Sequence, residues 1–171
     1  MASKMAGNSV VVLAVACLFA ITFGCTGKQS TRGRDEENTN ALALAQLINQ
    51  ERLNNGISGM TWDVGIAAVE QAHAEWIAAK DPPGAYIYPY VEAGEGGKVF
   101  TDRLDDASIP YTTATEYGYA DASYTNAALV FPQLPDDVFT NASYTRFGIG
   151  YARPPEREPG KHYWVIGLVD E

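Results

Sequence analysis

The stretch YTRFGIGYAR, Tyr144 to Arg153, alternates in the manner of a β-strand, and HYWVIGLVD, His162 to Asp170, repeats the pattern. The turn-rich PPEREPGK between them predicts an antiparallel hairpin. Apolar side chains occupy both faces of these strands, with Phe147, Ile149 and Tyr151 on one face and Tyr163, Val165 and Val169 on the other. We therefore expect a sheet that is covered by helices on both sides.

Two longer helices are predicted before the hairpin. The first begins near Asn40, a good N-cap residue, and ends at Gly56. The second opens at Asp63 and ends at the Asp-Pro-Pro-Gly sequence of residues 81–84. The apolar stripe of the first helix holds Leu44, Leu47 and Ile48, and that of the second holds Ile66, Val69, His73, Trp76 and Ile77.

The middle of the chain predicts shorter elements. A short helix is expected in VFTDRLDDA, residues 99–107, and another from Tyr124 to Phe131, with β-prone residues from Tyr111 to Tyr119 between them. At 171 residues and 46% hydrophobic content, the chain can form one domain with a real core. The predicted fold class is therefore α+β.

The formal net charge of −9 limits the partners. The chain has no cluster of lysines and arginines that could displace counterions from phosphates, so a nucleic-acid partner is not expected. Direct binding to an anionic membrane surface is disfavoured for the same reason.

The first 25 residues differ from the rest. The apolar run from Val10 to Phe23 is short for a membrane-spanning helix and has the length of a signal-peptide core. Its end, TFGC, resembles the bacterial lipobox, which implies lipidation of Cys25 and a membrane anchor. An uncleaved anchor helix is the alternative. Residues 26–40 predict a flexible linker and residues 41–171 the folded domain, placed outside the cytoplasm in the cell envelope, or secreted if the anchor is absent.

Both cysteines, Cys17 and Cys25, precede the predicted domain. The folded part therefore has no thiol for a disulfide, a zinc site or a nucleophile.

Several short motifs in a fixed order resemble the CAP superfamily, also called the SCP or pathogenesis-related-1-like domain, in its bacterial secreted form. They are LINQERLNNG (residues 47–56), Trp62-Asp63, AAVEQAHAEW (67–76), FTDRL (100–104), Glu116, YTRFGIGYA (144–152) and YWVIGL (163–168). The resemblance implies a three-layer α-β-α sandwich around a mainly antiparallel sheet.

The resemblance also implies a cavity, which in many members of the family binds a divalent metal through two histidines and one or two acids. This chain keeps one acid as Glu116, followed by Tyr117 where the family has asparagine. Its loop from residue 81 to 98 holds no histidine, and Pro135 stands at the second histidine position. We therefore expect no bound metal and no cofactor.

Other residues could supply catalytic or metal-binding groups in place of the missing histidines. His73 and His162 are the only histidines, and both are interpreted as structural. Seven acids could form a hard-cation site, although no calcium-loop pattern is present and solvated surface acids are the simpler interpretation. They are Glu92, Glu95, Asp102, Asp105, Asp106, Asp136 and Asp137.

The tyrosines suggest a ligand site. Tyr86 and Tyr88 alternate in the loop that should border the cavity, and Tyr117 adjoins Glu116. Rings with a polar tip suit amphipathic or glycan ligands, but they could also simply cover the sheet. We predict that Glu116, Tyr117, Tyr86 and Tyr88 bind a small molecule, lipid or glycan, or an envelope protein.

Two functions follow as hypotheses. The first is an envelope-anchored lipoprotein whose CAP-like domain is a non-enzymatic binding or interaction module. The alternative is a hydrolase of envelope polymers or peptides that uses Glu116 with acidic partners. Asn49, Glu51 and Arg52, in the motif LINQERLNNG, are expected to form structural hydrogen bonds and to carry no chemistry.

Overall fold

The computed structural model describes residues 31–80, 95–153 and 160–170, and it forms one four-stranded sheet with the order β1-β3-β4-β2. The strands are β1 (Thr61–Trp62), β2 (Ala114–Asp121), β3 (Arg146–Ala152) and β4 (His162–Val169). β4 pairs antiparallel with both β3 and β2, and β1 pairs parallel with β3. The predicted hairpin and the mainly antiparallel sheet are therefore confirmed.

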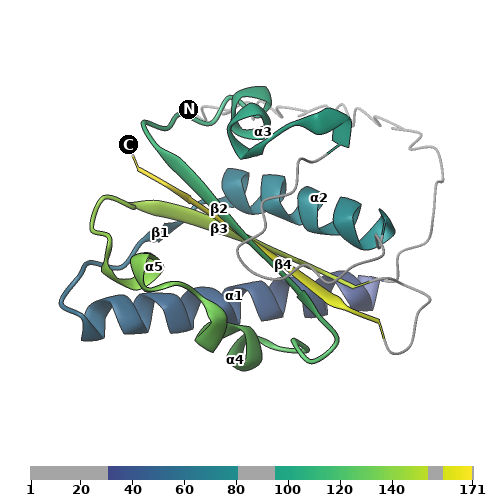
Figure 1. The fold of residues 1–171 in the computed structure, drawn as a ribbon, viewed down its shortest axis with the longest axis horizontal. Coiled ribbons are helices and arrows are strands. Elements are labelled where there is room, and N and C mark those ends of the chain that lie inside the picture. Colours follow the sequence, from purple (N-terminus) through teal and green to yellow (C-terminus); the bar gives the residue numbers. More distant parts are fainter. Residues whose placement is uncertain (1–30, 81–94, 154–159, 171) are drawn as a thin grey trace, which may run out of the picture.

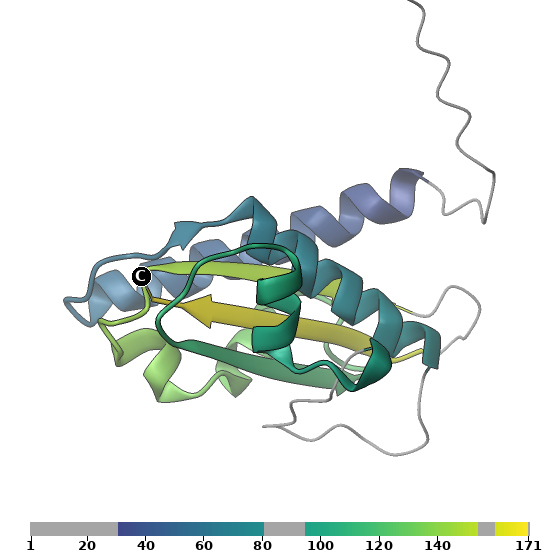
Figure 2. The same ribbon diagram turned by 90° about the horizontal axis from the view of Figure 1, so that it is seen from above.

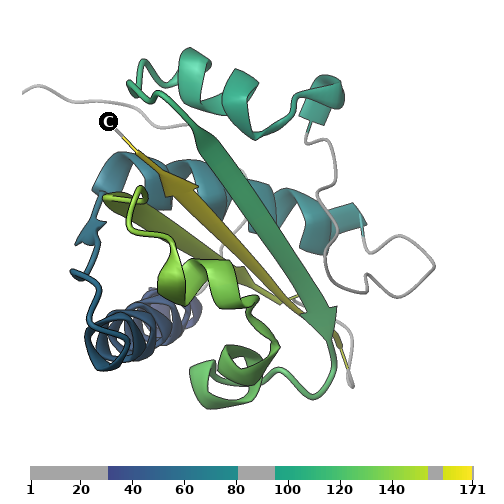
Figure 3. The same cartoon turned by 60° about the vertical axis from the view of Figure 1, so that its left-hand side comes forward.

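Helices cover both faces of the sheet (Figures 1 and 3). One layer contains α2 (Val64–Lys80) and α3 (Phe100–Asp106), with the short 3-10 helix η1 (Glu95–Gly97) before α3. The opposite layer contains α1 (Thr31–Asn54), α4 (Ala127–Val130), the 3-10 helix η2 (Phe131–Gln133) and α5 (Asp136–Thr140). This arrangement is the three-layer α-β-α sandwich expected from the sequence.

The first helix begins earlier than predicted. α1 starts at Thr31 instead of near Asn40 and runs without interruption to Asn54 (Figure 2), so residues 31–40 are helical where a flexible linker was expected. Extending a helix that is already nucleated costs little, and this stretch contains arginine and glutamate, which favour helices. The predicted cap at Asp63 is confirmed, because its Oδ1 accepts hydrogen bonds from the backbone N–H groups of Gly65 and Ile66.

The two faces of the hairpin divide as the alternation predicted. Phe147, Ile149 and Tyr151 belong to the core under α1, together with Trp164. The opposite face of β4 packs under α2 and α3. Both hairpin strands lie inside the sheet, which explains why nearly every residue of β3 and β4 is buried.

Glycines allow α2 to lie directly on β3. A Cβ atom on Gly148 would lie 2.2 Å from the backbone nitrogen of Ala67, and one on Gly150 would lie 2.1 Å from the carbonyl oxygen of Glu70. The backbones of helix and strand are therefore in contact at these two positions, and no larger residue fits.

The polar residues of LINQERLNNG attach α1 to the segments that precede β1 and β3. Arg52 is 1% exposed and donates hydrogen bonds to the carbonyl oxygens of Ser58, Val138, Asn141 and Tyr144, over 2.8–3.1 Å. The Asn49 side chain exchanges two hydrogen bonds with the backbone of Met60, of 2.8 and 2.9 Å. The structural interpretation of this motif is confirmed.

Replacing Trp164 by alanine should lower the free energy of unfolding by about 3–5 kcal/mol, as loss of a buried aromatic side chain does. Trp164 is fully buried in the central strand β4, and its indole N–H donates to the carbonyl oxygen of Tyr124 at 2.9 Å. Denaturant titration of both forms measures the difference. Coincident midpoints would place this strand outside the core.

Candidate functional site

Four polar side chains meet between the sheet and the layer formed by α2 and α3; we call them the buried cluster. Glu70 and His73 come from α2, Arg103 from α3 and Glu116 from β2. Glu70, His73 and Glu116 are 0%, 3% and 4% exposed, and the side chain of Arg103 is 12% exposed. Charged groups are rarely buried to this extent without partners, so their contacts decide what the cluster does.

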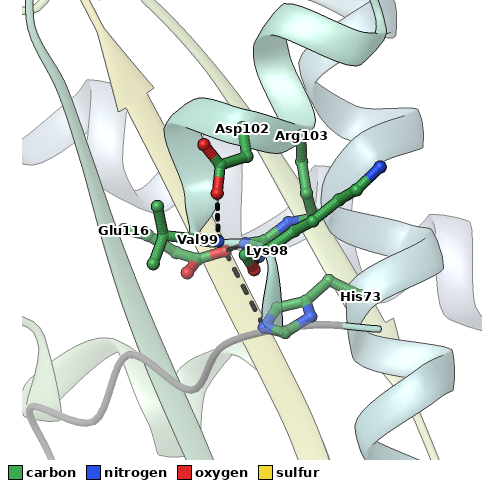
Figure 4. A network of polar contacts seen from close by, with 6 residues as sticks. All are labelled: His73, Lys98, Val99, Asp102, Arg103 and Glu116. Atoms are coloured by element: carbon green, nitrogen blue, oxygen red, sulfur yellow. Dashed lines mark hydrogen bonds and ion pairs between the residues drawn. The ribbon is translucent and has the colours of Figure 1, made fainter. Parts of the chain in front are cut away.

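Glu116 is the centre of these contacts. Arg103 donates from Nη2 to Glu116 Oε1, and His73 Nε2 lies 4.0 Å from the same oxygen. Figure 4 shows the side chains of His73 and Arg103 directed toward Glu116. Arg103 also donates from Nη1 to the carbonyl oxygen of Lys98 at 2.9 Å, which fixes the guanidinium at the start of α3. The ion pair thus joins α3 to the sheet.

Glu70 reaches the cluster through space left by a glycine. Gly167 of β4 is the register partner of Glu116, and a Cβ atom on Gly167 would lie 2.2 Å from Glu70 Oε1. Glu70 lies one helical turn before His73 on the same face of α2. The two carboxyl groups therefore share one buried site.

Burial raises the pKa of Glu70 well above its usual range, and the negative charge of Glu116 and a hydrogen bond with it raise that pKa further. The positive charge of Arg103 acts in the opposite direction. Neither carboxyl oxygen of Glu70 meets a donor among the described residues, and the same holds for Oε2 of Glu116. A proton on Glu70 would supply the missing donor between the two groups.

The sheet separates two of the residues that were predicted to bind a ligand. Glu116 faces α2 and α3, whereas Tyr117 faces the opposite layer, where its hydroxyl donates to Asp137 Oδ2. Tyr86 and Tyr88 lie outside the described residues, so their predicted role stays a prediction. The structure therefore does not bring Tyr117 to Glu116.

The surface acids have local structural contacts. Asp102 Oδ2 accepts from the backbone N–H of Val99 at 3.1 Å, and Asp106 pairs with Lys98 on the surface. Within the described residues, no group of three or more histidines, cysteines and acids is arranged to hold a metal ion. His162, at the start of β4, lies 2.5 Å from the Tyr151 hydroxyl through Nδ1 and stacks on that ring.

The predictions of a signal peptide and a lipidated cysteine concern the N-terminal segment of the chain. Cys25 and the apolar run before it lie outside the described residues. In the ranges that are described, no helix is both long enough and apolar enough to cross a membrane.

Sequence reasoning missed Glu70 and Arg103 as members of the site. Glu70 lies four residues after Ile66 and three before His73, so helical periodicity places it on the buried stripe. An acid at such a position signals a buried partner. Arg103 lies within the motif FTDRL, but its pairing with Glu116 depends on tertiary structure.

No family model matches the sequence, and no curated protein sequence is significantly similar to it. Solved structures do resemble it. An extracellular SCP-domain protein from Bacillus anthracis aligns with a TM-score of 0.68 and 14% identity, over 85% of this chain and 45% of that one. A cysteine-rich secretory protein from Staphylococcus aureus aligns with a TM-score of 0.55 and 11% identity, over 79% and 39% of the two chains.

An outer surface protein from Borrelia burgdorferi aligns with a TM-score of 0.57 and 10% identity, over 76% of this chain and 92% of that one. The chain thus spans less than half the length of the first two proteins and nearly all of the third. Identities this low are informative about the fold alone. The chain therefore shares the fold of the SCP-domain protein, and the other two structures align with it over most of its length.

Proposed function

We propose that this chain is a bacterial cell-envelope lipoprotein whose CAP-like domain binds a ligand or an envelope protein and has no enzymatic activity. The extracellular, secretory and outer-surface descriptions of the three similar structures support a location outside the cytoplasm. The lipobox-like sequence that ends at Cys25 supports the anchor.

The burial of Glu116 is the observation that carries the non-enzymatic part of the proposal. A general base or nucleophile must reach the substrate or an attacking water. The side chain of Glu116 is only 2% exposed, and its Oε1 is held by Arg103. The nearby acid, Glu70, is fully buried beneath it. A hydrolase would need at least one of these carboxyl groups to open toward solvent.

We expect the purified protein to bind no stoichiometric zinc. Catalytic zinc needs about three protein ligands, and the guanidinium of Arg103 already neutralises Glu116, the acid retained from the family pattern. Elemental analysis after dialysis against zinc provides the measurement. About one zinc per chain that is lost in Glu116→Gln would contradict the proposal and favour metal-dependent hydrolysis.

The exported protein should carry lipid on Cys25 as its mature N-terminal residue. The apolar run ends directly before this cysteine and a polar stretch follows. Mass spectrometry of the mature N-terminus distinguishes the possibilities. An intact Met1, or cleavage elsewhere with Cys25 unmodified, would remove the lipoprotein part of the proposal and leave the binding domain to be tested separately.

A further inference from the structure

We propose that Glu70 and Glu116 share one proton and act as a pH-sensitive latch that holds α3 against the sheet. The groups that make up this latch come from three elements: α2 supplies Glu70, β2 supplies Glu116 and α3 supplies Arg103. The latch is independent of the ligand and of the lipid anchor.

The geometry requires a proton. Two fully or almost fully buried carboxyl groups face a single guanidinium, and three of their four oxygens have no donor among the described residues. A neutral Glu70 removes one of the two negative charges and donates to Glu116. Two adjacent carboxyl groups in a buried site cannot both ionise without a large cost.

The charged and titratable groups around Glu70 are few. In the described part of the chain they are Glu116 on β2, Arg103 on α3 and His73 on α2. The strands beneath Glu70 present glycines, Gly150 and Gly167, which offer no compensating charge. Among the described residues, ionisation of Glu70 is therefore opposed by burial and by the charge of Glu116, and is favoured by the charge of Arg103.

α3 is the element that would detach. It is seven residues long, and it contacts the rest of the domain through Phe100, Leu104 and the Arg103 ion pair. When α3 moves away, water can hydrate both carboxyl groups. The open form then binds the Glu70 proton with the ordinary affinity of a glutamate, and the closed form binds it more tightly.

The sign of the pH dependence follows from this difference. The pKa of Glu70 is raised in the closed form, so the latch is fully effective below the ordinary glutamate pKa of about 4.3. It weakens as the pH rises toward the closed-form pKa. In that window the opening constant of α3 should rise up to about tenfold per pH unit and then level off.

Nuclear magnetic resonance of the full-length chain in detergent micelles tests the latch. We expect the side-chain carboxyl carbon of Glu70 to titrate well above the usual glutamate range. Amide hydrogen exchange of α3, divided by the intrinsic exchange rate, should increase over the same window. The amides of α1, on the far side of the sheet, serve as the internal reference.

Glu70→Gln removes the titrating carboxyl group. It should also abolish the increase of α3 exchange with pH, because the glutamine amide can donate to Glu116 at every pH. Glu75→Gln, five residues further along α2 and outside the cluster, is the matched control and should keep the pH-dependent exchange of α3. The titration of Glu70 in the wild-type protein tests the latch even if a variant does not fold. An ordinary Glu70 titration, α3 exchange that is flat with pH, or equal increases in α1 and α3 would overturn the proposal.

Discussion

Replacing Gly150 by alanine should destabilise the domain by about 3 kcal/mol or more, which is severe for a single added methyl group. The new Cβ would lie 2.1 Å from the carbonyl oxygen and 2.3 Å from the carbonyl carbon of Glu70. These are backbone atoms of α2, so no side-chain rotation relieves the overlap. Either α2 must lift from β3 or the strand must distort. Thermal or denaturant unfolding measures the loss.

Gly65→Ala is the control for the Gly150 substitution. Gly65 lies in the first turn of α2, and its closest neighbours are side-chain atoms of Asp63 and Ile109 at 3.1–3.2 Å. These groups can shift, and alanine favours a helix, so we expect a change within about 1 kcal/mol. If Gly150→Ala were as stable as Gly65→Ala, the close contact of α2 with β3 would be wrong.

Arg52→Met should cost about 3–5 kcal/mol of unfolding free energy. Methionine keeps much of the apolar stem but leaves the carbonyl oxygens of Ser58, Val138, Asn141 and Tyr144 without their donor. The bonds to Val138 and Tyr144 are buried, so water cannot replace the guanidinium there without opening the structure. α1 should then detach from the segment that precedes β3.

The exposed Arg153 provides the matched substitution for this experiment. Arg153→Met removes the same charge at the surface, where an exposed contact contributes about 1 kcal/mol or less, so its effect should be well below that of Arg52→Met. Denaturant midpoints of the two variants are compared with that of the wild type. Equal midpoints for both variants would mean that Arg52 does not hold α1 in place.

The sequence predicts the central part of the fold because two periodicities are clear there. Large side chains that alternate with glycines mark β3, a strand-length apolar run marks β4, and the cap at Asp63 with its apolar stripe marks α2. β1 has only two residues, and its pairing with β3 is a tertiary property, so no periodicity could reveal it. The start of α1 was misplaced because polar residues resemble a linker even when a helix continues through them.

The site was only partly predictable. Glu116 was identified through the resemblance to a family, but its burial was not predicted. Glu70 was missed because acids are normally read as solvent-facing, and the residues that make its burial tolerable lie on other elements. The prediction that Tyr117 and Glu116 share a site was wrong, because successive side chains of β2 lie on opposite faces of the sheet.

The most direct test of the central claim, that this SCP-like domain binds a ligand without catalysing its reaction, is a turnover assay on envelope polymers. Purified protein is incubated with peptidoglycan and with envelope peptides, and new reducing ends and new amino groups are counted over time. The buried ion pair of Glu116 with Arg103 predicts that wild type and Glu116→Gln release neither above the background without protein. Turnover by the wild type that disappears in Glu116→Gln would contradict the claim and establish a hydrolase.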